Sequence, residues 1–177
     1  MRHSVLRAAV ATALMVCLWV WPSTAVALDT SAGFGLQDRA LFQETVDYTL
    51  TNQSNRDFRN QNLSNTSFAG AIGRGADFRD ANLHGAILTQ GAFAEADFRG
   101  ADLSDALMDR ADFVASDLRD AVLIGVIASG SSFSRALIEG ADFTDALLDR
   151  DDQRRLCREA DGMNPTTGVS TFDSLGC

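Results

Sequence analysis

Few side chains of this sequence are spaced in a way that could do chemistry. His84 has no nucleophilic partner at a recognisable spacing, so we interpret it as a surface residue. The acidic stretch 149–161 lacks the glycine and the terminal glutamate of a calcium-binding loop. The run "GRGADF" at 73–78 is not a phosphate-binding loop, because the chain contains no lysine. The sequence therefore predicts a protein that is not an enzyme and has no cofactor or metal site.

Residues 1–27 have the pattern of a secretory signal peptide. A basic start precedes an apolar run over 8–21, and Ala25-Val26-Ala27 forms a small-x-small cleavage site. The alternative, a retained membrane anchor, is disfavoured because spanning a bilayer takes about 20 apolar residues. We expect an exported protein with no membrane insertion after cleavage.

The cysteines point to an oxidising compartment. Cys17 lies inside the signal peptide, which leaves Cys157 and Cys177 in the mature chain. An even pair in an exported protein predicts a disulfide between Cys157 and Cys177.

The charge balance excludes nucleic acid as a partner. The whole chain has 15 basic and 24 acidic residues, a net charge of −9, and every basic residue is arginine. Losing Arg2 and Arg7 with the signal peptide takes the net charge to −11. Such a surface repels nucleic acid and anionic lipid.

An apolar residue recurs at every fifth position over residues 56–150. A period of five fits neither a helix nor a strand, and its persistence indicates an internal repeat of the solenoid type. Alanine stands two residues before most of these positions. The register comprises Phe58, Leu63, Phe68, Gly73, Phe78, Leu83, Leu88, Phe93, Phe98, Leu103, Met108, Phe113, Leu118, Leu123, Ala128, Phe133, Ile138, Phe143 and Leu148.

The pattern A-[DN]-[LF]-x-x, seen as "ADFRD", "ANLHG", "ADFRG", "ADLSD" and "ADFTD", resembles the pentapeptide-repeat family. That resemblance implies an all-β solenoid, a right-handed quadrilateral β-helix in which four pentads make one coil. Asp-Phe-Arg at 57–59, 77–79 and 97–99, with Asp-Leu-Arg at 117–119, recurs at every fourth pentad and supports four sides. We expect these tripeptides to stack as a solvated ion-pair face. The same stacking places Gly73 in a column of inward aromatic residues, where the lack of a side chain is expected to leave a gap.

One outward column is apolar instead of charged. Stacking every fourth pentad aligns Ile87, Leu107, Ile127 and Leu147 in a line that begins at Ser67. Four apolar side chains on an acidic rod call for a cover or a partner. Two interpretations stay open: a terminal segment packs over them, or they form a docking strip for a partner protein or a second copy.

The segments at the two ends are predicted to cap the repeat with short helices. Residues 28–55 form the N-terminal cap, with a helix over 36–46, and residues 151–177 form a helical C-terminal cap that contains the disulfide. The helix after Leu148 is expected to end at Gly162. The tail "LCREADGMNPTTGVSTFDSLGC" is similar to that of thylakoid-lumen pentapeptide-repeat proteins of cyanobacteria and chloroplasts.

Two functions fit the sequence. The first is a non-catalytic, rigid protein-binding or scaffolding module in the thylakoid lumen or periplasm, present as a monomer or weak dimer with a protein partner. The alternative, taken from the resemblance to quinolone-resistance pentapeptide proteins, is an acidic DNA mimic that binds gyrase. An export signal opposes this alternative, because gyrase is cytoplasmic.

Overall fold

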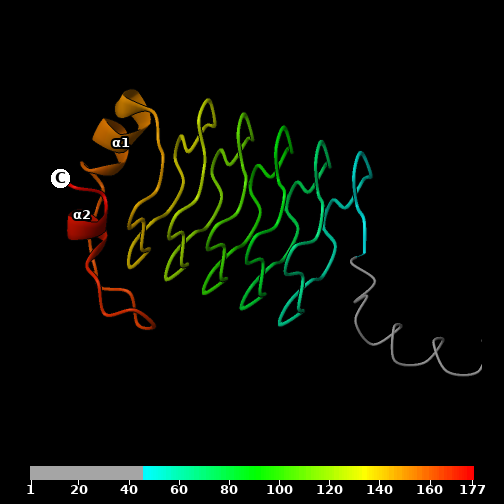
Figure 1. The fold of residues 1–177 in the computed structure, drawn as a ribbon, viewed down its shortest axis with the longest axis horizontal. Coiled ribbons are helices and arrows are strands. Elements are labelled where there is room, and N and C mark those ends of the chain that lie inside the picture. The colour runs from blue at the N-terminus through cyan, green and yellow to red at the C-terminus, as the bar shows by residue number, and fades with distance from the viewer. Residues whose placement is uncertain (1–45) are drawn as a thin grey trace, which may run out of the picture. The chain divides into compact units, whose positions relative to one another are not determined.

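The computed structural model of the protein describes residues 46–177, which form a stack of coils followed by two short helices (Figure 1). The predicted signal peptide, residues 1–27, lies outside the described residues, as does nearly all of the helix predicted over 36–46. In the part of the chain that the structure describes, no helix is long and apolar enough to cross a membrane.

The chain advances by one coil every four pentads. Each parallel bridge joins residues at equivalent positions of successive coils, from Asp47 with Ser67 to Ile127 with Leu147. The backbone N–H of Tyr48, for example, donates to the carbonyl of Ser67 over 2.8 Å. Every pentad contributes one isolated bridge, so each coil has four short sides and the described repeat contains no longer strand. The solenoid and its period of four pentads are therefore as predicted.

Tight turns at the last residue of each pentad make the corners. Every fifth residue from Leu50 to Asp145 has a positive φ. At one corner Asn60 has φ 56°, and the N–H of Gln61 donates to the carbonyl of Phe58 over 3.2 Å. This is the geometry of a type II turn, which Gly and Asn adopt most easily. This backbone requirement explains why Gly, Asn or Asp stands at the fifth position of most pentads.

The inside of the coils is filled by one large and one small side chain per side. Phe58, Phe78 and Phe98 are fully buried, and their rings stack at centroid distances of 4.8 and 4.7 Å. Ala96 and Ala101 are fully buried at the small inward positions. Burial contributes about 1.5–3 kcal/mol for each large side chain, and this repeats at every level.

The gap expected at Gly73 is filled by an aromatic ring of the next coil. A Cβ atom added to Gly73 would lie 2.6 Å from Cδ1 of Phe93, so the ring occupies the space that a side chain would need. Phe93 in turn stacks on Phe113 at 5.6 Å, and Phe113 stacks on Phe133 at 5.4 Å. The aromatic column is therefore continuous above Gly73.

The coil begins earlier than the predicted boundary at residue 56. Tyr48 and Gln53 occupy central positions and are 9% and 7% exposed, and bridges start at Asp47. Residues 47–55, which were predicted to belong to the N-terminal cap, thus form part of the first coil. Two residues before the central positions, Thr51 and the exposed Arg56 stand where later coils have Ala, Gly or Ser.

Two helices lie across the other end of the stack, α1 (Arg150–Leu156) and α2 (Thr171–Ser174). Leu156 of α1 and Leu175 after α2 are each 3% exposed and join the hydrophobic core. The hydroxyl of Ser174 accepts the N–H of Phe143 over 3.0 Å. These contacts hold the C-terminal segment against the last coil.

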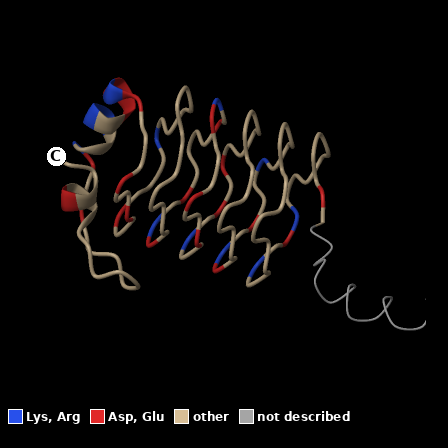
Figure 2. Ribbon diagram, viewed as in Figure 1, with Lys and Arg blue, Asp and Glu red and all other residues tan. Residues whose placement is uncertain are grey.

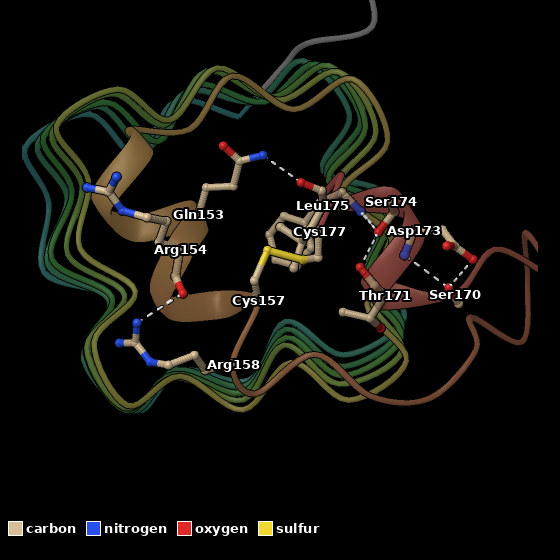
Figure 3. Close-up of a disulfide and its surroundings, with 11 residues drawn as sticks. Gln153, Arg154, Cys157, Arg158, Ser170, Thr171, Asp173, Ser174, Leu175 and Cys177 are labelled. Carbon is tan, nitrogen blue, oxygen red and sulfur yellow. Dashed lines mark hydrogen bonds between the residues drawn. A yellow bond between two sulfur atoms is a disulfide. The ribbon is translucent and has the colours of Figure 1, made fainter.

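The prediction that the first of these helices continues to Gly162 is wrong. α1 ends at Leu156, and Cys157 forms a disulfide of 2.01 Å with Cys177 over the centre of the four-sided coil (Figure 3). Beyond the disulfide the chain turns back to the coil, where the carbonyl of Asp161 accepts the N–H of Gly140 over 2.9 Å. Docking of this segment on the coil competes with continued helix.

Candidate protein-binding face

The structure aligns the four predicted apolar residues in one ladder, which we call the strip (Ile87, Leu107, Ile127 and Leu147). Bridges join each member to the next. Leu107 is 37% exposed and Leu147 is 59% exposed, whereas Ile87 and Ile127 are half-buried. No residue between 46 and 177 covers the strip fully, so the C-terminal segment is not its cover.

Charged residues are few in the pentads that carry the strip. Pentads 86–90 and 126–130 contain none, and pentads 106–110 and 146–150 each contain one Asp and one Arg. The outward position that carries the strip holds Asp47 and Ser67 in the first two coils, so the apolar part of the column begins at the third level. The strip is thus an apolar line on the surface of a protein with a net charge of −9.

The opposite side carries an ion-pair ladder, in which four Asp and four Arg residues alternate along the stack. Arg79 Nη2 lies 2.6 Å from Asp77 Oδ2, and its Nε lies 3.5 Å from Asp97 Oδ2 in the next coil. The same bidentate pairing repeats at all four levels. Figure 2 marks the acidic and basic residues along the ribbon. The members are Asp57, Asp77, Asp97, Asp117, Arg59, Arg79, Arg99 and Arg119.

In these ion pairs, each arginine stabilises the charged form of the aspartate that it contacts. Hydrogen bonds from the side chain and backbone of Arg59 lower the pKa of Asp57 to about 2. A hydrogen bond from Arg79 likewise lowers the pKa of Asp77. Because four Asp and four Arg residues alternate, the ladder itself adds no net charge. The pair of Asp57 and Arg59 is exposed and the other three pairs are partly buried, and solvent-accessible pairs of this kind are individually weak. The arrangement fits the predicted solvated ion-pair face.

Two other exposed apolar side chains on the sides of the coil, Ile72 and Leu137, stand singly in their columns. Ile72 is 48% exposed, but the next residues of its column are Ala92 and Asp112. Leu137 is 53% exposed and follows Asp117. The strip differs because its members support one another over four levels.

The residues considered for chemistry are not brought together. His84 is exposed, and its Nδ1 lies 3.9 Å from Asp105 Oδ2. In the acidic stretch 149–161, Asp151 and Asp152 form ion pairs with arginines one turn later on α1. Within residues 46–177 no group of three His, Cys, Asp or Glu side chains is placed to hold a metal ion.

Asn164 is a structural residue that the sequence patterns did not predict. Asn164 is buried, and its amide donates to the carbonyls of Asp120, Ala121 and Gly140 over 2.9–3.2 Å. Its side-chain oxygen accepts the N–H groups of residues 166 and 167. Asn164 thereby pins the C-terminal loop to a corner of the coil. The Asn-Pro pair in the tail was the available signal, since it favours a turn.

The pinned loop overhangs the ion-pair ladder. Two shallow hollows of about 330 and 360 Å³ lie beneath it, and Arg99 and Asp120 line both. Their walls combine charges of both signs with Met163 or Pro165 of the loop. The arginines here are already paired, so the hollows offer less for recognition than the strip.

Comparison with known families matches the repeat region directly. The family described as pentapeptide repeats (8 copies) matches residues 57–90 and 116–150, and one described as pentapeptide repeats (9 copies) matches residues 74–117. Together the matches span more than half of the chain. The chain belongs to the pentapeptide-repeat family.

Solved structures of other pentapeptide-repeat proteins resemble this one. A pentapeptide repeat protein from the Arabidopsis thaliana thylakoid lumen is 36% identical, over 74% of this chain and 84% of its own, with a TM-score of 0.36. The protein Rfr23 from the cyanobacterium Cyanothece 51142 is 23% identical over 52% of this chain and 64% of its own, with a TM-score of 0.51. The second likeness shows the fold alone, and such neighbours imply a right-handed β-helix solenoid. No curated protein matches the chain.

Proposed function

We propose that this pentapeptide-repeat protein is an exported, non-catalytic binding module that holds a partner protein against one side of a rigid rod. The observation that carries the proposal is the strip, a four-level apolar ladder that no described residue covers. Apolar side chains aligned in this way lose water when another protein packs on them, and each contributes roughly in proportion to the area buried. The repeated backbone bridges keep the line straight, so little ordering is needed on binding.

The compartment is proposed from two features of the chain. Residues 1–27 have the signal-peptide pattern, and the disulfide between Cys157 and Cys177 is of the kind that persists outside the reducing cytosol. A thylakoid lumen or a periplasm satisfies both features. The Arabidopsis relative, which is described as a lumen protein, favours the first.

The gyrase-binding alternative has less support. A protein that imitates DNA must present a continuous column of negative charge, as the phosphate backbone does. Here each Asp of the ladder is neutralised by an Arg at 2.6 Å. The acidic residues that remain are spread over corners and the other sides.

Affinity capture from the native membrane-bounded compartment tests the proposal. The bait is the mature protein in three forms: wild type, Leu107→Asp, and Ile72→Asp as the matched control. Aspartate occupies the equivalent position in neighbouring pentads, such as Asp97 and Asp112, so both variants are expected to keep the fold. We expect one partner to be retained by wild type and Ile72→Asp and lost with Leu107→Asp.

Two results would contradict the proposal. Equal recovery of the partner with all three baits would show that the strip is not the binding surface. A precursor that remains unprocessed in the cytoplasm on fractionation would exclude the proposed compartment and with it the lumen or periplasmic role.

A further inference from the structure

The strip is bordered by carboxylates at alternate levels. The sequences around its two most exposed members are "DALMD" and "DALLD", whereas those around Ile87 and Ile127 are "GAILT" and "GVIAS". Asp105 precedes Leu107 by two residues and stands at the adjoining corner, as Asp145 does for Leu147. A binding partner therefore meets an apolar line whose edge is acidic at two of four levels.

The two edges of the strip are not equivalent. On one edge Asp149 accepts the N–H of Gly130 over 2.8 Å, and Asp109 is followed directly by Arg110. On the other edge the side chain of Asp105 is 68% exposed and Asp145 is exposed. His84, with its Nδ1 3.9 Å from Asp105, is the neighbouring basic group there. The acidic edge that is available for a ligand is thus the edge of Asp105 and Asp145.

The size of the strip argues against a second copy of the chain as its occupant. Complete burial of four Leu or Ile side chains removes at most about 400 Å² from water. A stable dimer needs about 800 Å² from each partner. The strip spans three coil spacings, or roughly 14 Å. A partner element that matches this length is a short apolar-edged segment. An α-helix of three turns, about 16 Å long, is such a segment.

We propose that the strip binds an amphipathic helix of a partner protein, with Leu-type residues on the strip and Lys or Arg along the flank that faces Asp105 and Asp145. The spacings agree. Asp105 and Asp145 are two coils apart, about 9.6 Å, and helix residues seven positions apart are separated by about 10.5 Å. Helix residues three or four apart follow the strip at nearly one per coil. This inference rests on the proposed function and adds the chemistry of the partner.

Two synthetic helical peptides, each of about four turns, test the inference on the mature protein. Both carry the same Leu stripe, and they differ in having two Lys or two Glu residues, seven positions apart, on one flank. Binding is measured by fluorescence anisotropy. We expect the Lys peptide to bind about fivefold to tenfold more tightly than the Glu peptide, because two exposed ion pairs replace two repulsions.

Three variants assign the effect to named residues. The double variant Asp105→Asn, Asp145→Asn should bring the two peptides to similar affinity; Asn65 stands at the same corner of an earlier coil, so asparagine fits there. Leu107→Ser should weaken the Lys peptide roughly tenfold through lost apolar burial, since Ser67 shows that the column accepts serine. Ile72→Ser, on the adjacent side, should leave the affinity unchanged.

Three outcomes would overturn the inference. The first is equal affinity of the Lys and Glu peptides for wild type. The second is an unchanged preference in the Asp105→Asn, Asp145→Asn variant. The third is a wild-type dimer in sedimentation that becomes a monomer on Leu107→Ser, which would make a second copy the occupant. Capture of a partner that depends on Leu107, together with no charge preference between peptides, would retain the proposed function and reject only this inference.

Discussion

The guanidinium of Arg56 lies over the ring of Tyr48, with its central carbon 5.1 Å from the ring centroid. It lies equally close, at 5.0 Å, to the ring of Phe58, and its Nη1 donates to Gln53 Oε1 over 2.7 Å. The amide of Gln53 in turn donates to the hydroxyl of Thr51 over 2.7 Å. In the first coil, the linked polar side chains of Arg56, Gln53 and Thr51 thus lie against the aromatic core.

Removing the side chain of Arg56 should destabilise the protein. We expect Arg56→Ala to lower the free energy of unfolding by about 1–2 kcal/mol, because a cation–π contact with two rings and a hydrogen bond are both lost. The measurement is urea unfolding followed by circular dichroism. Arg74→Ala is the control, since Arg74 forms an exposed pair with Glu95 and should cost less than about 1 kcal/mol. Equal losses for the two variants would refute this role of Arg56.

Gly73→Ala should destabilise the protein, although replacing glycine by alanine often has the opposite effect. The new methyl group would meet the ring of Phe93, and overpacking of this kind costs about 1–3 kcal/mol. Thermal unfolding measures the change. Adding Phe93→Leu to Gly73→Ala should recover part of the loss. A Gly73→Ala variant as stable as wild type would show that the ring does not fill this gap.

The disulfide should stabilise the C-terminal segment. It closes a loop between Cys157 and Cys177, with a sequence separation of 20, for which the chain-entropy estimate is roughly 3 kcal/mol. In Cys157→Ser, Cys177→Ser we expect a lower urea midpoint and faster amide exchange over residues 150–177. Protection in the coil at Phe78 and Phe98 should change less. An exchange pattern over 150–177 identical to that of wild type would contradict this role.

Acid should weaken the fold through the ion-pair ladder. The pKa of Asp57 is lowered to about 2 and that of Asp77 is lowered as well, against an ordinary value of 3.8. Groups with a lower pKa in the folded state stabilise it above the unfolded pKa and lose that contribution as the pH falls through the folded pKa. We expect the urea midpoint to decline between about pH 4 and pH 2.

The Asp77→Asn variant separates this effect from other acid-sensitive contacts. Asparagine keeps an oxygen for the N–H of Arg79 but does not titrate. Its urea midpoint should be lower than that of wild type at about pH 6 and should fall less on acidification. If the variant and wild type decline in parallel, the ladder at Asp77 makes no contribution to acid stability.

The repeat and the strip could be predicted because both depend on the five-residue period, which is visible in the sequence itself. Once every fourth pentad stacks, the position of Ile87, Leu107, Ile127 and Leu147 on one side follows without further information. The start of the coil did not follow, because Gln53 stands where the pattern has Leu or Phe, and Thr51 and Arg56 stand where it has a small residue. Arg56 appeared as a departure from the pattern, and its meaning depended on contact with rings in three dimensions.

The C-terminal segment was harder to predict for a related reason. Its helices are short, and their ends are set by docking on the last coil instead of by local signals. Cys157 could be paired with Cys177 by elimination, but the end of α1 at Leu156 depends on where the chain turns back toward Gly140. Asn164 has the same character, since its hydrogen bonds reach carbonyls of the two preceding coils that are far from it in sequence.

The most direct test of the central claim is carbene footprinting of the mature protein by mass spectrometry, alone and with the captured partner. The strip should be labelled in the free protein, most at Leu147 and Leu107, and should become protected in the complex, while Ile72 stays labelled in both. Protection of Leu107 and Leu147 in the free protein, or equal labelling of both residues with and without the partner, would contradict the claim that this ladder is an open binding surface.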